Sequence, residues 1–233
     1  MNKIKTMLVA VVAITFISTY AFAGSIGFGV TGSLAAIGAV GSETEGTVTD
    51  TSPTDASAHN NAYIGSLFAE YTMDGDHGMT FGVDWIPGAA DVNDKTVSRT
   101  DTELSQTGEE KETTASVTRT AQATIDSHMT YYAELPVHAG TYVKLGWTQM
   151  DVNTKESFAG TKGYGNTSVD GVMYGVGYKV ASDSNWYYKL EGTHTDYDSF
   201  TLNEVNQSTG SAQSSITADL DVTKATFALG YKF

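Results

Sequence analysis

Carboxylates and lysines recur at alternate positions of several segments whose intervening positions are apolar. A lone charge that is enclosed away from water is expensive, so charges of both signs on an enclosed face should pair. We predict an ion-pair network inside the molecule. Its members would be Glu70, Asp84, Asp126, Glu134, Lys144, Lys179, Lys189, Glu191 and Lys224. The alternative is that these charges are scattered over a solvated face.

Nucleophilic catalysis would need a hydroxyl, a base and a carboxylate on one surface. Asp126, Ser127 and His128 are the right types, but strand alternation sends Ser127 to the face opposite the other two. His194 shares a face with Asp196, with no serine in reach along the strand. We therefore expect no catalytic residue.

Metal ligation has only weak candidates. Asp74-Gly75-Asp76 resembles the opening of a calcium loop, but the later ligands and the closing glutamate are missing. The acidic stretches 43–61 and 196–217 contain no lysine or arginine, which leaves weak divalent binding or a solvated, repulsive surface. The chain has no cysteine, which excludes thiolate sites and disulfides. We expect no metal site and no cofactor.

The elements that carry these residues are extended segments with a period of two. In the last of them, Phe227, Leu229, Tyr231 and Phe233 share one face, and small or polar residues occupy the other. About nine to eleven tilted strand residues cross a bilayer, so such a segment could span one. Eight segments show the pattern: 25–34, 63–71, 79–85, 125–135, 142–148, 172–179, 186–193 and 225–233.

The connections between these segments alternate in length. Short turns at 74–78, 136–140 and 181–185 are rich in Gly, Pro, Asp, Ser and Asn. Long polar loops would cover 43–61, 88–124, 151–168 and 196–217. Short turns at one rim and long loops at the other are typical of outer-membrane barrels, and an even strand number places both termini in the periplasm.

The longest of the predicted loops has a composition that is typical of strands. Residues 95–121 are rich in Thr, Ser and Val, which suggests a polar hairpin continuing beyond the membrane, with disorder as the alternative.

Residues 1–23 combine Lys3 and Lys5, a short apolar run and small residues at 21 and 23. We therefore predict a cleaved signal peptide followed by one barrel domain at 24–233. Losing two lysines takes the formal charge from −14 to −16, which argues against a nucleic-acid partner.

The chain as a whole resembles the small eight-stranded outer-membrane barrels of the OmpA-like, OmpX-like and opacity-protein-like kind. The resemblance covers residues 24–233 and includes Thr195-Asp196-Tyr197-Asp198 and the terminal Gly230-Tyr231-Lys232-Phe233. It implies an all-β, antiparallel up-and-down transmembrane barrel in the outer membrane, in contact with outer-membrane lipid and lipopolysaccharide. It also implies that the barrel-insertion machinery recognises a C-terminal signal formed by Phe227, Leu229, Tyr231 and Phe233. Because nothing follows Phe233, we expect no periplasmic anchoring domain.

The function that these features favour is a non-catalytic surface protein. The barrel would anchor acidic extracellular loops for envelope structure, adhesion or contact with an unknown extracellular partner. A narrow pore for small solutes is the alternative, because lumen glycines could leave water paths. A lipid-modifying barrel enzyme is a third candidate. A soluble lipocalin-like binder is disfavoured, because the face that would be its interior carries Lys, Glu and Thr.

Overall fold

The structure is a computed structural model that describes residues 24–44, 53–75, 78–91, 97–106, 112–157, 163–205 and 215–233. The predicted signal peptide lies outside the described residues. Within them there are twelve strands: β1 (Gly24–Thr44), β2 (Pro53–Met73), β3 (Thr80–Trp85), β4 (Ala90–Asp91), β5 (Val97–Gln106), β6 (Glu112–His138), β7 (Thr141–Ser157), β8 (Gly163–Tyr164), β9 (Thr167–Ala181), β10 (Trp186–Tyr197), β11 (Phe200–Val205) and β12 (Ser215–Lys232). None of the described residues forms a helix long and apolar enough to cross a bilayer.

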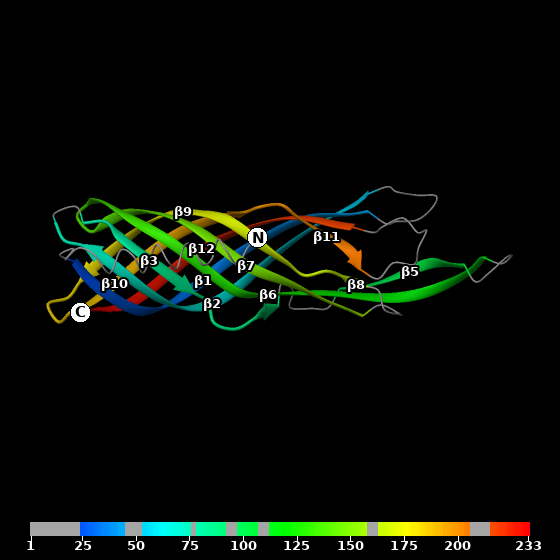
Figure 1. Cartoon of the computed structure of the whole chain (residues 1–233), viewed down its shortest axis with the longest axis horizontal. Helices are drawn as coiled ribbons and strands as arrows, with labels where there is room; N and C mark the ends of the chain where they lie inside the picture. Colours follow the sequence, from blue (N-terminus) through cyan, green and yellow to red (C-terminus); the bar gives the residue numbers. More distant parts are fainter. Residues whose placement is uncertain are drawn as a thin grey trace.

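Eight of these strands form a closed antiparallel wall. Each strand of the series β1, β2, β3, β6, β7, β9, β10 and β12 pairs with the next, and β1 pairs back with β12 from Gly27↔Lys232 to Thr44↔Ser215. The short connections and the C-terminus lie at one end of the barrel (Figure 1). The predicted fold class, an eight-stranded antiparallel barrel, is confirmed.

Alternation along the wall places apolar side chains outside and polar ones inside. Trp85, Leu145, Val176 and Phe227 are between 43% and 63% exposed, whereas Glu70 and Lys144 are 4% and 7% exposed. A core of a soluble protein would show the opposite order. Aromatic rings gather near the short turns, where Trp186 packs edge-on against Tyr231 and Tyr231 against Phe233. This is the arrangement of an interfacial aromatic girdle.

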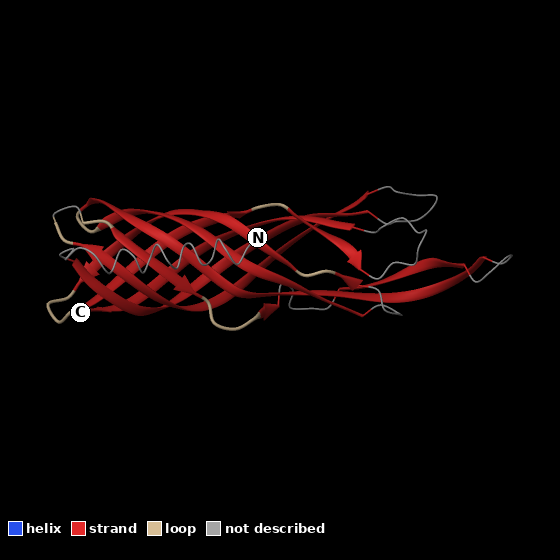
Figure 2. Ribbon diagram, viewed as in Figure 1, coloured by secondary structure: helices blue, strands red, loops and turns tan. Residues whose placement is uncertain are grey.

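The strands continue further than the sequence pattern predicted. β1 runs to Thr44 and β2 starts at Pro53, so most of the predicted loop 43–61 is paired strand. The predicted loop 88–124 contains a hairpin, in which β5 pairs with β6 from Val97↔Ala121 to Gln106↔Glu112. This hairpin lies at the end opposite the short turns (Figure 2). The predicted loop boundaries were wrong because the outer face stops being apolar before strand pairing ends, and pairing continues into water.

The polarity of the two faces reverses along the barrel axis. At the long-strand end the interior is apolar, with Met150, Val152, Val169 and Leu220 buried against one another. Ile37 and Ile125 pack against the same cluster from β1 and β6. The outer face at this level carries aspartates such as Asp170 and Asp221. The part of the barrel that extends beyond the lipid is therefore packed like a soluble protein.

A β-bulge interrupts β6 at Ser127, which has a φ of 52°. The register with β7 shifts between Asp126↔Asp151 and Met129↔Gln149, so two residues of β6 face one of β7. A bulge of this kind inverts the phase of alternation on its two sides. Ile125 consequently points inward to the apolar cluster, although the sequence pattern placed it outside.

Candidate functional site in the barrel lumen

A lysine lies between two glutamates at the centre of the lumen. Lys189 on β10 forms an ion pair with Glu70 on β2, and its Nζ lies 2.5 Å from Oε1 of Glu134 on β6. All three side chains are buried. Both contacts span the barrel interior, because β10 is a neighbour of neither β2 nor β6 in the wall.

Two further lysines extend this centre to six charged residues. Nζ of Lys179 on β9 lies 2.8 Å from Oε1 of Glu70, and Nζ of Lys144 on β7 lies 2.7 Å from Oε2 of Glu191 on β10. We call Glu70, Glu134, Lys144, Lys179, Lys189 and Glu191 the lumen network. Each member has at least one partner of opposite charge, which buried charges require.

Tyrosines complete the hydrogen bonding of the lumen network. The Tyr132 hydroxyl donates to Oε2 of Glu70 at 3.1 Å, and the Tyr142 hydroxyl donates to Oε1 of Glu191 at 2.5 Å. Nζ of Lys144 lies 4.0 Å from the centre of the Tyr132 ring, within the range of a cation–π contact. These tyrosines are not among the residues predicted for the site. They could have been identified because they lie on the same strand face as the predicted charges.

Glycines on neighbouring strands make room for these rings. A methyl group added at Gly82 would overlap the Tyr132 ring, and one added at Gly177 would overlap the Tyr142 ring. Gly230 has the same relation to Tyr187. From the sequence alone, the lumen glycines could leave narrow water paths. At these three positions the structure fills the space with aromatic side chains instead.

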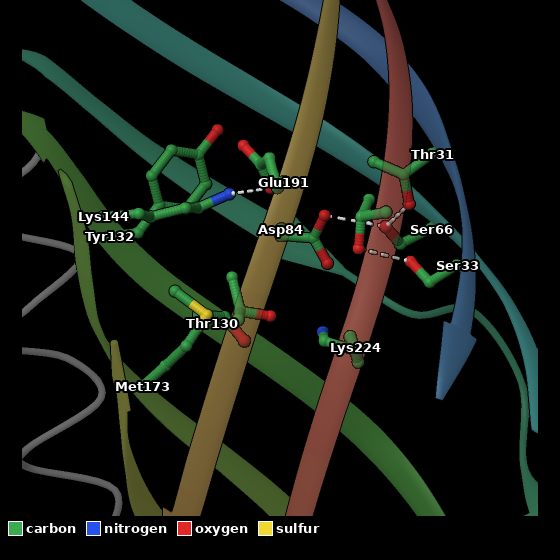
Figure 3. A pocket seen from close by; sticks show the side chains of 12 residues that line it. Thr31, Ser33, Ser66, Asp84, Thr130, Tyr132, Lys144, Met173, Glu191 and Lys224 are labelled. Carbon is green, nitrogen blue, oxygen red and sulfur yellow. Dashed lines mark hydrogen bonds and ion pairs between the residues drawn. The ribbon is translucent and has the colours of Figure 1, made fainter. Parts of the chain in front are cut away.

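Asp84 and Lys224 lie beside the lumen network, around a small cavity (Figure 3). The Ser66 hydroxyl donates to Oδ2 of Asp84 at 2.7 Å. Neither Asp84 nor Lys224 forms an ion pair with any residue that the structure describes. The cavity has a volume of about 20 Å³, room for about one water molecule. Together with the lumen network, the interior holds equal numbers of carboxylates and lysines.

The prediction that Asp126 belongs to this group is wrong. Asp126 is directly opposite Asp151, which lies between the inward-facing Met150 and Val152 in sequence and therefore faces outward. Its Oδ2 accepts a hydrogen bond from Asn153 Nδ2 at 2.8 Å on the same outer face. The bulge at Ser127 is the physical reason, because it shifts Asp126 out of phase with His128.

Of the residues weighed for catalysis, Asp126 and His128 lie on opposite faces of the wall, whereas His194 and Asp196 are in contact. His128 Nε2 lies inside the barrel, 2.8 Å from the Tyr197 hydroxyl, while Asp126 lies outside. His194 Nε2 is 3.1 Å from Oδ1 of Asp196, and its Nδ1 is 2.8 Å from Oγ1 of Thr223. Across the described ranges, no group of three or more His, Cys, Asp or Glu is arranged to hold a metal ion.

The predicted insertion residues lie on the lipid-facing side of β12. Phe227 is half-exposed, and Phe233 packs edge-on against Tyr231 and Phe28. Their recognition by the insertion machinery stays a prediction.

Comparisons with known proteins identify the family of this chain. The family model described as "Outer membrane protein beta-barrel domain" matches residues 9–233. No curated protein matches the chain. Several solved structures are similar in fold, although their TM-scores are below 0.5.

The outer membrane protease OmpT from Escherichia coli is 8% identical, with a TM-score of 0.47, 93% of this chain and 99% of that chain covered. OprG from Pseudomonas aeruginosa is 10% identical, with a TM-score of 0.46 and coverage of 91% and 97%. The attachment invasion locus protein Ail of Yersinia pestis is 15% identical, with a TM-score of 0.36 and coverage of 88% and 99%. Because the family model covers nearly the whole sequence, the chain belongs to the outer-membrane β-barrel domain family.

Proposed function

We propose that this outer-membrane barrel is a non-catalytic anchor that presents an acidic, strand-built extracellular surface for contact with other molecules. In this arrangement both termini and the short turns face the periplasm, and the long strand extensions face outward from the cell. Outer-membrane lipid and lipopolysaccharide surround the barrel, and the insertion machinery delivers it through its last strand.

The observation that carries this proposal is the closed lumen. The lumen network joins β2, β6, β7, β9 and β10 across the interior at membrane depth. Tyr132, Tyr142 and Tyr187 fill the space beside it, and the adjoining cavity holds only about 20 Å³. An eight-stranded barrel leaves an interior that side chains can fill. The apolar cluster around Met150 closes the interior a second time at the other end.

The extracellular end supplies the second support. Beyond the lipid-facing band, every charged side chain that the structure describes on the outer surface is a carboxylate. These are Asp55, Asp126, Asp151, Asp170, Asp196, Asp198, Asp219 and Asp221. Such a concentration of one sign creates a field that attracts cationic molecules and repels anionic ones. A closed barrel with a charged exterior is suited to presentation rather than transport.

A narrow pore is the second candidate, favoured by the polar cavity between Asp84 and Lys224. Single-channel recording in planar bilayers separates the two functions. We expect no steady conductance from folded protein, with heat-modifiable gel mobility as the check on folding. Reproducible conductance steps would refute the closed anchor. The doubly substituted barrel Lys189→Met, Glu134→Gln removes a central ion pair without leaving a charge, and it is the control for leakage through a loosened lumen.

A further inference from the structure

Thr193 on β10 carries a buried hydroxyl that lacks a hydrogen-bond partner. The residue is 5% exposed, and none of the described residues donates to its Oγ1 or accepts from it. An unsatisfied buried hydroxyl costs stability, and such groups in native structures call for an explanation. Thr193 lines the small lumen cavity that Asp84 and Lys224 also line. A molecule bound in this cavity could supply the missing partner.

The register places Thr193 directly beside Lys224. The two residues are opposite one another on β10 and β12, and on its other side Thr193 is opposite Gly175 of β9. A methyl group added at Gly175 would lie 2.8 Å from Cγ2 of Thr193. The methyl group of Thr193 therefore covers Gly175, which leaves the hydroxyl to the cavity.

Lys224 and Asp84 reach the same cavity from β12 and β3 (Figure 3). Neither forms an ion pair with another residue in the part of the chain that the structure describes. Lys224 is partly accessible, although its inward-facing neighbours on β12, Val222 and Thr226, are buried. The Ser66 hydroxyl donates to Oδ2 of Asp84, and an ionised carboxylate can accept several further hydrogen bonds.

The size and the charge of the cavity identify the molecule that it can hold. Its volume of about 20 Å³ has room for about one water molecule. The charged residues in its lining are two carboxylates and two lysines: Asp84, Glu191, Lys144 and Lys224. Lys144 and Glu191 form an ion pair at 2.7 Å, so one charge of each sign remains. An added ion would leave a net charge enclosed in the lumen, which is costly, whereas water is neutral.

We propose that this cavity binds one ordered water molecule, which bridges Lys224, Asp84 and Thr193. The Lys224 ammonium group donates to the water oxygen, and the water donates to the Asp84 carboxylate. The Thr193 hydroxyl takes a third hydrogen-bonding position of the water. Buried waters typically make about three hydrogen bonds to groups that are otherwise unsatisfied. Asp84 and Lys224 thereby form a water-mediated ion pair.

The water completes the connections between the strands across the lumen. The lumen network takes side chains from β2, β6, β7, β9 and β10, and the water joins β3 and β12 to β10. On β1, the Thr31 hydroxyl is hydrogen-bonded to that of Ser66. The Ser33 hydroxyl is hydrogen-bonded to that of Thr226 at 2.8 Å. All eight strands of the wall then contribute to a hydrogen-bonded interior.

A crystal structure of the folded wild-type barrel in detergent tests the identity of the bound molecule. Parallel crystals are soaked in sodium bromide and in rubidium chloride. We expect one density peak within hydrogen-bond distance of Lys224 Nζ, the Asp84 carboxylate and Thr193 Oγ1. We expect no anomalous signal from bromide or rubidium at this peak. An anomalous signal would identify an ion instead of water, and a cavity without a peak would mean that nothing binds. Either result would overturn the proposal.

Replacing Thr193 with valine provides a second test, because the two explanations of its hydroxyl predict opposite changes in stability. Valine has nearly the shape of threonine but lacks the hydroxyl. If water satisfies the hydroxyl, Thr193→Val loses a hydrogen bond, and the urea midpoint of unfolding should fall by about 0.5 M. A hydroxyl without a partner is costly, so its removal would instead raise the midpoint. A raised midpoint would overturn the proposal.

The matched control is Thr148→Val. The Thr148 hydroxyl is buried outside the cavity lining and donates to the Met129 carbonyl at 3.2 Å. This variant should also lower the midpoint, which shows that the assay reports the loss of a satisfied hydroxyl. Its crystals should keep the density peak in the cavity, whereas those of Thr193→Val should show a weaker peak.

This inference rests on the closed lumen of the proposed function and states what fills its polar cavity. The two can fail separately. Reproducible conductance would refute the closed anchor, whereas the density peak, the anomalous signal and the stability of Thr193→Val decide whether the cavity binds water.

Discussion

Replacing Lys189 with methionine is the most direct test of the lumen network. Lys189 is the ion-pair partner of both Glu70 and Glu134, and Glu134 has no other ion pair among the residues that the structure describes. Methionine keeps most of the side-chain length, so the main change is the loss of the charge. Removing one partner of a buried ion pair costs about 3–5 kcal/mol, because the other charge stays buried and uncompensated.

The cost of Lys189→Met should lie at the lower end of this range of free energies. Glu70 keeps Lys179 at 2.8 Å and the Tyr132 hydroxyl at 3.1 Å, so only Glu134 loses its partner completely. We expect Lys189→Met to lower the free energy of unfolding by about 3 kcal/mol. With a urea dependence of about 1–3 kcal/mol per molar, the unfolding midpoint should fall by about 1–3 M.

The assay is urea unfolding in lipid vesicles, followed by tryptophan fluorescence. The double variant Lys189→Met, Glu134→Gln removes the uncompensated charge and should recover most of the loss. Lys232→Met, at the exposed barrel rim, controls for the loss of a lysine as such. A wild-type midpoint for Lys189→Met, or a double variant no more stable than the single one, would refute the reasoning.

Two further predictions concern the tyrosines around the lumen network. Tyr142→Phe removes the hydroxyl that donates to Glu191 and should destabilise the barrel by about 1.5–3 kcal/mol, measured by the same unfolding assay. Gly177→Ala would overlap the Tyr142 ring and should cost about 1–3 kcal/mol, whereas Gly192→Ala on the outer face, with no atom within 4 Å, should be nearly neutral. Equal stability of the two alanine variants would contradict the role of Gly177 in seating the ring.

The barrel wall was predictable because its signal is local. Residues such as Trp85 and Leu145 alternate with polar neighbours, and the period of two does not depend on which strands pair. Ion-pair partners are different, because Glu70 meets Lys189 only after the wall has closed with a particular stagger. The sequence pattern could therefore place these charges inside, but it could not choose which carboxylate each lysine would contact.

Asp126 shows where local alternation fails. Its neighbour Ser127 takes a positive φ, which few residues other than glycine adopt, so nothing in the residue types marks the bulge. Register information from β7 is needed to see that Asp126 faces Asp151. The same shift turns Ile125 inward, and the sequence pattern had no means of anticipating the apolar cluster that Ile125 joins.

The reversal of polarity along the barrel links the wall to the proposed function. Where lipid surrounds the wall, the polar side chains turn inward, and their charges must be neutralised. The ion pairs of the lumen network neutralise these charges, and the same side chains fill the interior. Where water surrounds it, the apolar side chains turn inward around Met150 and the carboxylates turn out. Both halves thus close the interior for different reasons. The same reversal that fills the interior places the acidic groups on the outside of the long-strand end, which is the end that we propose faces out of the cell.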